Sequence, residues 1–192
     1  KRDSAGNPTG WFLEGTASLA MEHLNVFNEA SIADGTDLVF DIMNGYGITA
    51  VFDAGALDVA TMALGVLQRL DAAGEFTVRL VGSHMVAAPD QMDGALDLVE
   101  NLAATTKSDR YHIRMLKIMD DGTIEGRTAG MFVDYQGDPG NKGATVFTQA
   151  QLDSMVIDAA GRQIDVHIHA LGERAIHEAL NAIEAARTAH SD

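Results

Sequence analysis

The residues from 164 to 175 constrain the fold most strongly, because their pattern changes from that of a strand to that of a helix. Apolar and polar side chains alternate from Ile164 to His169, and helical spacing begins directly afterwards. Alternate side chains of a strand share a face, so Asp165, His167 and His169 should point to one side and the apolar residues to the other. A strand that buries one face under helices and leads into a helix is typical of an α/β protein with a parallel sheet.

Three further segments of the chain have the pattern of strands, and each is followed by a helical pattern. The strands are expected at residues 48–52, 76–86 and 111–119. The helices between them are expected at residues 58–70, from Pro89 through Ala103, and after a capping box formed by Thr148 and Gln151. The last helix should turn its apolar residues inward, namely Leu171, Ala175, Ile176, Ala179, Leu180 and Ile183.

The remaining segments lie before and within this alternating part. Residues 1–16 should form a loop or short hairpin, and helices are expected at 18–30 and 36–46. Residues 120–146 are rich in glycine and lack periodicity, which is typical of a functional loop. Parallel pairing with right-handed crossovers would join the strands into a small doubly wound sheet or into part of a larger barrel. One domain is expected over residues 1–192, in which a loop and helix segment at 1–35 precedes the βα units.

The composition argues against several classes of protein. Twenty-eight acidic and 13 basic residues give a formal charge of −15, which opposes binding to nucleic acid or anionic lipid. There is no cysteine, so any metal must be held by histidine, carboxylate or a modified lysine. No apolar run approaches the ~20 residues of a membrane-spanning helix. This composition suits the cytoplasm and the periplasm alike, so the sequence leaves the compartment open.

Lys117 stands among apolar residues near the end of the strand expected at 111–119. By parity it should share a face with Ile113, Met115 and Met119. Burial disfavours the ammonium form, and a neutral amine could react with carbon dioxide to give a metal-binding carbamate. The alternatives are a lysine that reaches solvent past the strand end, or one that is paired with Asp120 or Asp121.

His167 and His169 could bind one metal ion together, because they share a strand face and neutral imidazole is a common zinc ligand. The alternative is a pair of strand-end histidines that hydrogen-bond to neighbouring loops. His84 lies near the end of the strand expected at 76–86 and could lie beside these histidines at the C-terminal rim of the sheet. Arg127, in the long loop, could bind a substrate carboxylate or polarise a carbonyl, or it could pair with one of the many acids.

Two motifs resemble the metal-dependent amidohydrolase superfamily, and within it the amidohydrolase-3 group of N-substituted formamide deformylase-like and exoenzyme-regulator-like proteins. The first combines Lys-Ile-Met-Asp-Asp-Gly at 117–122 with Gly-Arg-Thr-Ala at 126–129. The second is His-Ala-Leu-Gly-Glu-Arg-Ala at 169–175. Residues 47–55 also resemble a segment of that group, so the resemblance extends over most of the chain.

The resemblance implies a (β/α)₈ TIM barrel with one or two divalent metal ions, usually zinc, at its C-terminal face. It implies that Lys117 is a carbamylated metal ligand on strand 4 and that His169 is the ligand on strand 5, so that the chain supplies strands 2 to 5. The implied activity is hydrolysis of a carbon–nitrogen bond in a small, amide-type, non-peptide molecule. His84, Arg127 and His167 are then expected at the substrate-binding side of the site.

Several parts of the family pattern are absent from this sequence. The strand-1 His-x-His pair, the strand-6 histidine and the catalytic aspartate of strand 8 have no counterparts, although residues 161–169 also resemble the strand-1 form. We therefore expect this chain alone to be inactive, to bind zinc weakly and to self-associate through its exposed sheet edges. A competing interpretation is a non-catalytic, doubly wound domain that binds a small ligand at the same strand ends.

Overall fold

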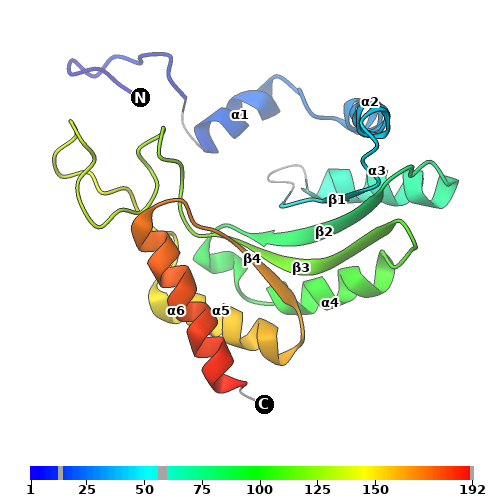
Figure 1. The fold of residues 1–192 in the computed structure, drawn as a ribbon. Helices are drawn as coiled ribbons and strands as arrows, with labels where there is room; N and C mark the ends of the chain where they lie inside the picture. The colour runs from blue at the N-terminus through cyan, green and yellow to red at the C-terminus, as the bar shows by residue number, and fades with distance from the viewer. Residues whose placement is uncertain (13–14, 56–59, 191–192) are drawn as a thin grey trace.

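The computed structural model describes residues 1–12, 15–55 and 60–190, and its centre is a four-stranded parallel sheet (Figure 1). The strands are β1 (Ala50–Phe52), β2 (Arg79–Val86), β3 (Tyr111–Met119) and β4 (Asp165–His169). They lie side by side in sequence order, without the order reversal of a doubly wound sheet. The sheet is a curled half-barrel, which confirms the predicted partial TIM barrel.

A helix follows each strand and packs against the outer face of the sheet (Figure 1). These helices are α3 (Ala60–Ala73), α4 (Ala95–Thr105), α5 (Gln149–Gly161) and α6 (Glu173–Ala189). The predicted capping box opens α5, where Thr148 and Gln151 exchange side-chain hydrogen bonds with each other's backbone. Pro89 instead begins a separate 3-10 turn, η2 (Pro89–Gln91), before α4. No helix within the described ranges is both long enough and apolar enough to cross a membrane.

The two N-terminal helices differ from the prediction in where they are separated. They are α1 (Gly15–His23) and α2 (Glu29–Gly45), so the break falls before residue 29 and not between 30 and 36. Asn28 caps α2 by accepting a hydrogen bond from the Ser31 backbone, and the Ser31 hydroxyl accepts one from the Asn28 backbone. Residues 31–35, which the prediction left between the two helices, therefore lie inside α2.

The core between the sheet and its helices has two clusters. One joins β2, β3 and β4 to α4, α5 and α6, with Leu116 and Ile118 fully buried and Val166 and Ile168 packed against them. The other lies nearer the N-terminal ends of the strands and includes Phe40, Phe76, Val78, Leu80, Tyr111 and Ile113. The predicted apolar face of β4 is therefore confirmed, and the opposite, concave face carries the polar set.

The prediction of which β3 side chains share a face of the sheet is wrong for the first half of the strand. Ile113 packs in the helix-side core, whereas Lys117 was expected to share its face. The cause is an irregularity between β2 and β3: Gly82 pairs with Ile113, but the next residue, Ser83, pairs with Met115. Arg114 is thus an extra residue in β3, and such a bulge shifts the alternation of side chains that follow it.

The predicted inward face of α6 is also partly wrong. The buried stripe consists of Ala175, Ala179, Ala182 and Ala186. Ile176, Leu180 and Ile183 were expected to face inward, but they are 44%, 60% and 45% exposed. Leu171, ahead of the helix, is 46% exposed as well. Small alanine side chains let α6 pack closely on α5, and the larger residues are left on the solvent side.

Candidate metal and active site

Lys117 and the histidines of β4 lie on the concave face, at the C-terminal ends of their strands. In the register of the sheet, Lys117 is flanked by Met85 on β2 and by His167 on β4, and His169 follows two residues later. The ring of His167 lies 5.3 Å from the ring of Phe52, which comes from the opposite edge of the sheet. The structure therefore brings three of the predicted site residues together, namely Lys117, His167 and His169.

Lys117 is buried, with 4% of its surface exposed, so it does not extend into solvent. Within the described ranges, no carboxylate pairs with its ammonium group, although Asp120 and Asp121 follow closely in the chain. Its side chain packs against the turn after β1, where a Cβ built on Gly55 would lie 3.3 Å from the Lys117 Cγ. Burial lowers the pKa of Lys117, because the charged form loses hydration without gaining a partner.

His169 is held by its contacts with the turn that follows β3. Its Nε2 lies 3.1 Å from the carbonyl oxygen of Gly122 and 3.7 Å from Oδ1 of Asp121. Both neighbours are acceptors, which favours the tautomer with hydrogen on Nε2. Nδ1 then carries the lone pair.

Asp121 ties the end of β3 to the start of α6. Its Oδ2 accepts hydrogen bonds from the backbone N–H groups of Gly172 (2.7 Å) and Gly130 (3.0 Å), and its Oδ1 accepts one from Leu171 (3.0 Å). The carboxylate is buried, and three backbone donors together with the N-terminus of α6 stabilise its charge. Sequence reasoning considered Asp121 only as a partner of Lys117, although the Asp-Asp-Gly turn after a strand was visible.

The loop at 120–146 is fixed against the same turn by a close backbone contact. The carbonyl oxygen of Gly130 accepts hydrogen bonds from the N–H groups of Arg174 (2.9 Å) and Ala175 (3.4 Å) at the N-terminus of α6. A Cβ built on Gly172 would lie 2.0 Å from this oxygen, so the contact requires glycine at 172. The loop thus lies beside the C-terminal ends of β3 and β4 (Figure 1).

Asp120 belongs to a second, helix-side group of polar residues. It is fully buried, and its Oδ1 accepts a hydrogen bond from the Phe147 backbone at 3.4 Å. Its Oδ2 has no hydrogen-bond partner among the residues that the structure describes. Burial raises the pKa of Asp120 to about 6, and the nearby charge of Glu178 acts in the same direction. Arg174 opposes this shift.

Arg127 lies in the 120–146 loop and is paired with Asp138, with 3.4 Å between Nη1 and Oδ2. Its backbone has a φ of 58°, and it borders a hollow of about 420 Å³ together with Lys1 and Asn141. The structure gives no contact of Arg127 with Lys117 or His169 among the described residues. Its substrate-binding role stays a prediction.

His84 is separated from the other predicted site residues by the sheet itself. It pairs in register with Leu116, one residue away from the Met85–Lys117 pair, and therefore faces the helices. It is half-buried there, and burial lowers its pKa. The expectation that His84 joins the rim around Lys117 does not agree with this placement.

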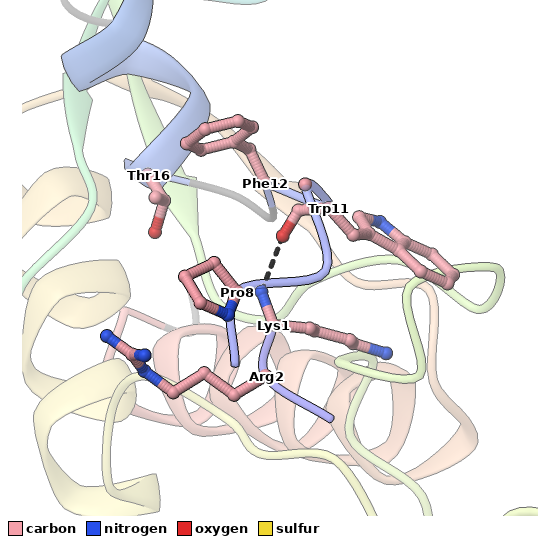
Figure 2. A pocket seen from close by; sticks show the side chains of 7 residues that line it. Lys1, Arg2, Pro8, Trp11, Phe12 and Thr16 are labelled. Carbon is pink, nitrogen blue, oxygen red and sulfur yellow. Dashed lines mark hydrogen bonds between the residues drawn. The ribbon is translucent and has the colours of Figure 1, made fainter. Parts of the chain in front are cut away.

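A separate pocket of about 240 Å³ lies in the N-terminal segment (Figure 2). It is lined by Lys1, Arg2, Pro8, Gly10, Trp11, Phe12 and Thr16. The N-terminal amine donates a hydrogen bond to the Trp11 carbonyl oxygen across it, and the Lys1 side chain lies 4.4 Å from the Trp11 ring centroid. None of these lining residues belongs to β3 or β4, so this pocket is distinct from the Lys117 site.

A parallel sheet with its strands in sequence order, each followed by a helix, is the arrangement found in (β/α) barrels. The chain belongs to the amidohydrolase family, because the model of that family matches residues 1–192. This confirms the resemblance noted in the motifs around Lys117 and His169.

Two relatives match nearly all of this chain but only part of their own length. The exoenzymes regulatory protein AepA of Pectobacterium carotovorum is 24% identical over 96% of this chain and 39% of its own length. The N-substituted formamide deformylase of Arthrobacter pascens is 29% identical over 97% of this chain and 34% of its own length. The chain therefore spans between a third and two fifths of these relatives.

Solved structures show the same fold. An uncharacterised metal-dependent hydrolase from Pyrococcus horikoshii superimposes with a TM-score of 0.67 at 20% identity, over 95% of this chain and 36% of that protein. A metal-dependent hydrolase from Pyrococcus furiosus gives the same TM-score and identity over 91% of this chain. Both matches extend over about a third of the solved protein.

Proposed function

We propose that this chain is the central part of a metal-dependent hydrolase that cleaves carbon–nitrogen bonds of small, amide-type, non-peptide molecules. The observation that carries the proposal is the buried Lys117, which has no carboxylate partner among the described residues and lies on the same strand-end face as His169. A buried amine without a counter-ion is costly, and such a group is retained where its chemistry is used. Family membership and the solved metal-dependent hydrolases of the same fold support this interpretation.

The residues present fit a divalent metal, for which we propose zinc, through Lys117 and His169. Among the described residues, no three His, Asp or Glu side chains gather in a metal-binding arrangement. A carbamate on Lys117 would add oxygen donors beside His169. The hydrogen bond from Nε2 of His169 to the Gly122 carbonyl oxygen would fix the ring and leave Nδ1 as donor. When bound, the metal would activate a water for attack on an amide-type carbon.

We propose that Lys117 acts as its carbamate. The neutral amine nitrogen adds to the carbon of carbon dioxide, a C–N bond forms, and one proton is released to solvent. Burial favours the reaction, because it lowers the pKa of Lys117 and so raises the share of neutral amine. The product carries two oxygen donors and a negative charge, which suits a divalent cation better than an ammonium group does.

We propose further that the isolated chain is inactive, binds zinc weakly and self-associates. The family pattern places further metal ligands and the catalytic aspartate on strands that are not among the four described here. The free edges of β1 and β4 and the exposed apolar residues of α6 offer surfaces for a second copy.

The hydrolase activity is testable in a chimera in which these residues replace the matching 34% of N-substituted formamide deformylase. We expect formate release from N-substituted formamides that a chelator abolishes and zinc restores. Lys117→Met should abolish this release, whereas Arg69→Met, at an exposed ion pair on α3, should leave it unchanged. A folded chimera that turns over equally well with Lys117→Met would contradict the proposal.

A further inference from the structure

His167 has a buried nitrogen that nothing in the described structure satisfies. Its Nδ1 is shielded from solvent and has no hydrogen-bond partner. A histidine that serves only to fill a core normally has its buried nitrogens hydrogen-bonded, because an unpaired polar atom in the interior is costly. The orphaned Nδ1 therefore points to a ligand.

From this geometry we infer that Nδ1 of His167 is a third protein donor, beside Lys117 and His169, to one divalent transition-metal ion on the concave face. This inference rests on the proposed function and adds a ligand to it. The family pattern carried onto this chain assigns only Lys117 and His169 as ligands, so His167 is an addition to that set.

The placement of the three side chains supports a common ligand. His167 is the in-register neighbour of Lys117, and His169 follows at the next position on the same face of β4. The ring of His167 is tilted by 56° against the ring of Phe52, with 5.3 Å between their centroids. This contact from the opposite edge of the sheet limits the rotation of the imidazole and holds it over the concave face.

The chemistry of the three groups also suits one metal ion. The lone pairs of the two imidazoles and the carbamate oxygens of Lys117 can share one cation. Histidine nitrogens together with one oxygen donor form a common zinc ligand set.

The test is a titration of the complete 192-residue chain with zinc in bicarbonate buffer, with binding measured by calorimetry. The visible spectrum of the cobalt(II) form is measured in addition. We expect His167→Phe, which keeps an aromatic ring beside Phe52, to weaken zinc binding by about tenfold or more and to change the cobalt spectrum. The matched control is His177→Phe, at an exposed histidine whose ring lies 5.7 Å from Phe132. This control should bind zinc as the wild type does.

A second measurement does not depend on the folding of any variant. In ¹⁵N-labelled wild-type chain, zinc should shift the ring-nitrogen resonances of both His167 and His169, and leave that of His177 in place. Zinc that shifts only His169 would overturn the inference while leaving the proposed function intact. Wild-type chain that binds no zinc would also overturn it. A different result would contradict the proposed function, namely that the Lys117→Met variant binds zinc as tightly as the wild type does.

Discussion

The rings of Phe52 on β1 and His167 on β4 lie 5.3 Å apart, although two other strands separate β1 from β4. Neighbouring strands are about 4.8 Å apart, so in a flat sheet these residues would be separated by roughly 14 Å. Their contact shows that four strands already have the curvature of a barrel. The side chains of the two edges meet on the face that carries Lys117.

Lys117→Met should stabilise the chain in the absence of metal. A methionine of similar length removes a buried charge that has no carboxylate partner in the described part of the chain, and we expect the free energy of unfolding at pH 7 to rise by roughly 1–3 kcal/mol. The pKa of Lys117 in the folded chain lies below its ordinary value of 10.5, so the wild-type lysine becomes neutral in the folded state as the pH rises. The stability advantage of Lys117→Met should therefore shrink as the pH approaches 10.5. Urea denaturation at pH 7 and pH 10 measures both effects. A loss of stability at pH 7 would show that the ammonium group has a partner.

Asp121→Asn should loosen the junction between β3, the long loop and α6. The amide retains the shape but can present only one acceptor oxygen to the three backbone donors that the carboxylate binds. We expect a loss of about 1.5–3 kcal/mol in the free energy of unfolding, measured by urea denaturation.

The control for this change is Asp134→Asn in the same loop. Asp134 is exposed and accepts one hydrogen bond, from the Gly140 backbone. Its replacement should cost about 0.5 kcal/mol or less. Equal effects of the two substitutions would show that the buried carboxylate of Asp121 has no special role.

Asp120 should make the chain less stable as the pH rises from 4 to 7. Its pKa is about 6 in the folded chain, against an ordinary value of 3.8, so the folded state holds the proton more tightly. The stabilisation is complete below pH 3.8 and is lost as the pH rises through 6, by up to about 3 kcal/mol. Asp120→Asn removes this titration. The stability difference between wild type and variant should therefore change over this range, and a constant difference would contradict the assignment.

The exposed apolar face of α6 should drive self-association of the isolated chain. Leu180 lies at its centre and is 60% exposed between Ile176 and Ile183. Leu180→Glu should weaken association by roughly tenfold, as measured by sedimentation at several concentrations. Leu24→Glu, at a residue between α1 and α2 that is 72% exposed, serves as control. If both substitutions act alike, the association is not specific to α6.

The sequence was sufficient to predict the strands and the face of β4 that carries the histidines. The strand at 111–119 and the capping box at Thr148 were predicted as the structure has them. These features depend on local alternation and on hydrogen bonds between near neighbours. The amidohydrolase-like motifs then predicted the curled half-barrel, because strand alternation alone does not distinguish it from a doubly wound sheet.

The errors in α6 and β3 have a common physical cause, since each depends on contacts with another element. In α6, the alanine stripe and the Ile176–Leu180–Ile183 stripe are both apolar, and only the close approach of α5 decides which one is buried. The extra residue at Arg114 leaves no local signal, because a bulge is defined by its partner strand. For the same reason, the contact between His167 and Phe52 could not be predicted from either strand alone.

The central claim is that Lys117 and His169 hold one metal ion, with Lys117 present as a carbamate. The most direct test is the ¹³C spectrum of the chain in ¹³C-labelled bicarbonate and zinc, with the lysine nitrogen labelled as well. We predict one carbamate carbon coupled to a lysine nitrogen, which disappears in Lys117→Met and weakens in His169→Phe. Zinc-bound wild-type chain without this signal, or the same signal in Lys117→Met, would contradict the account.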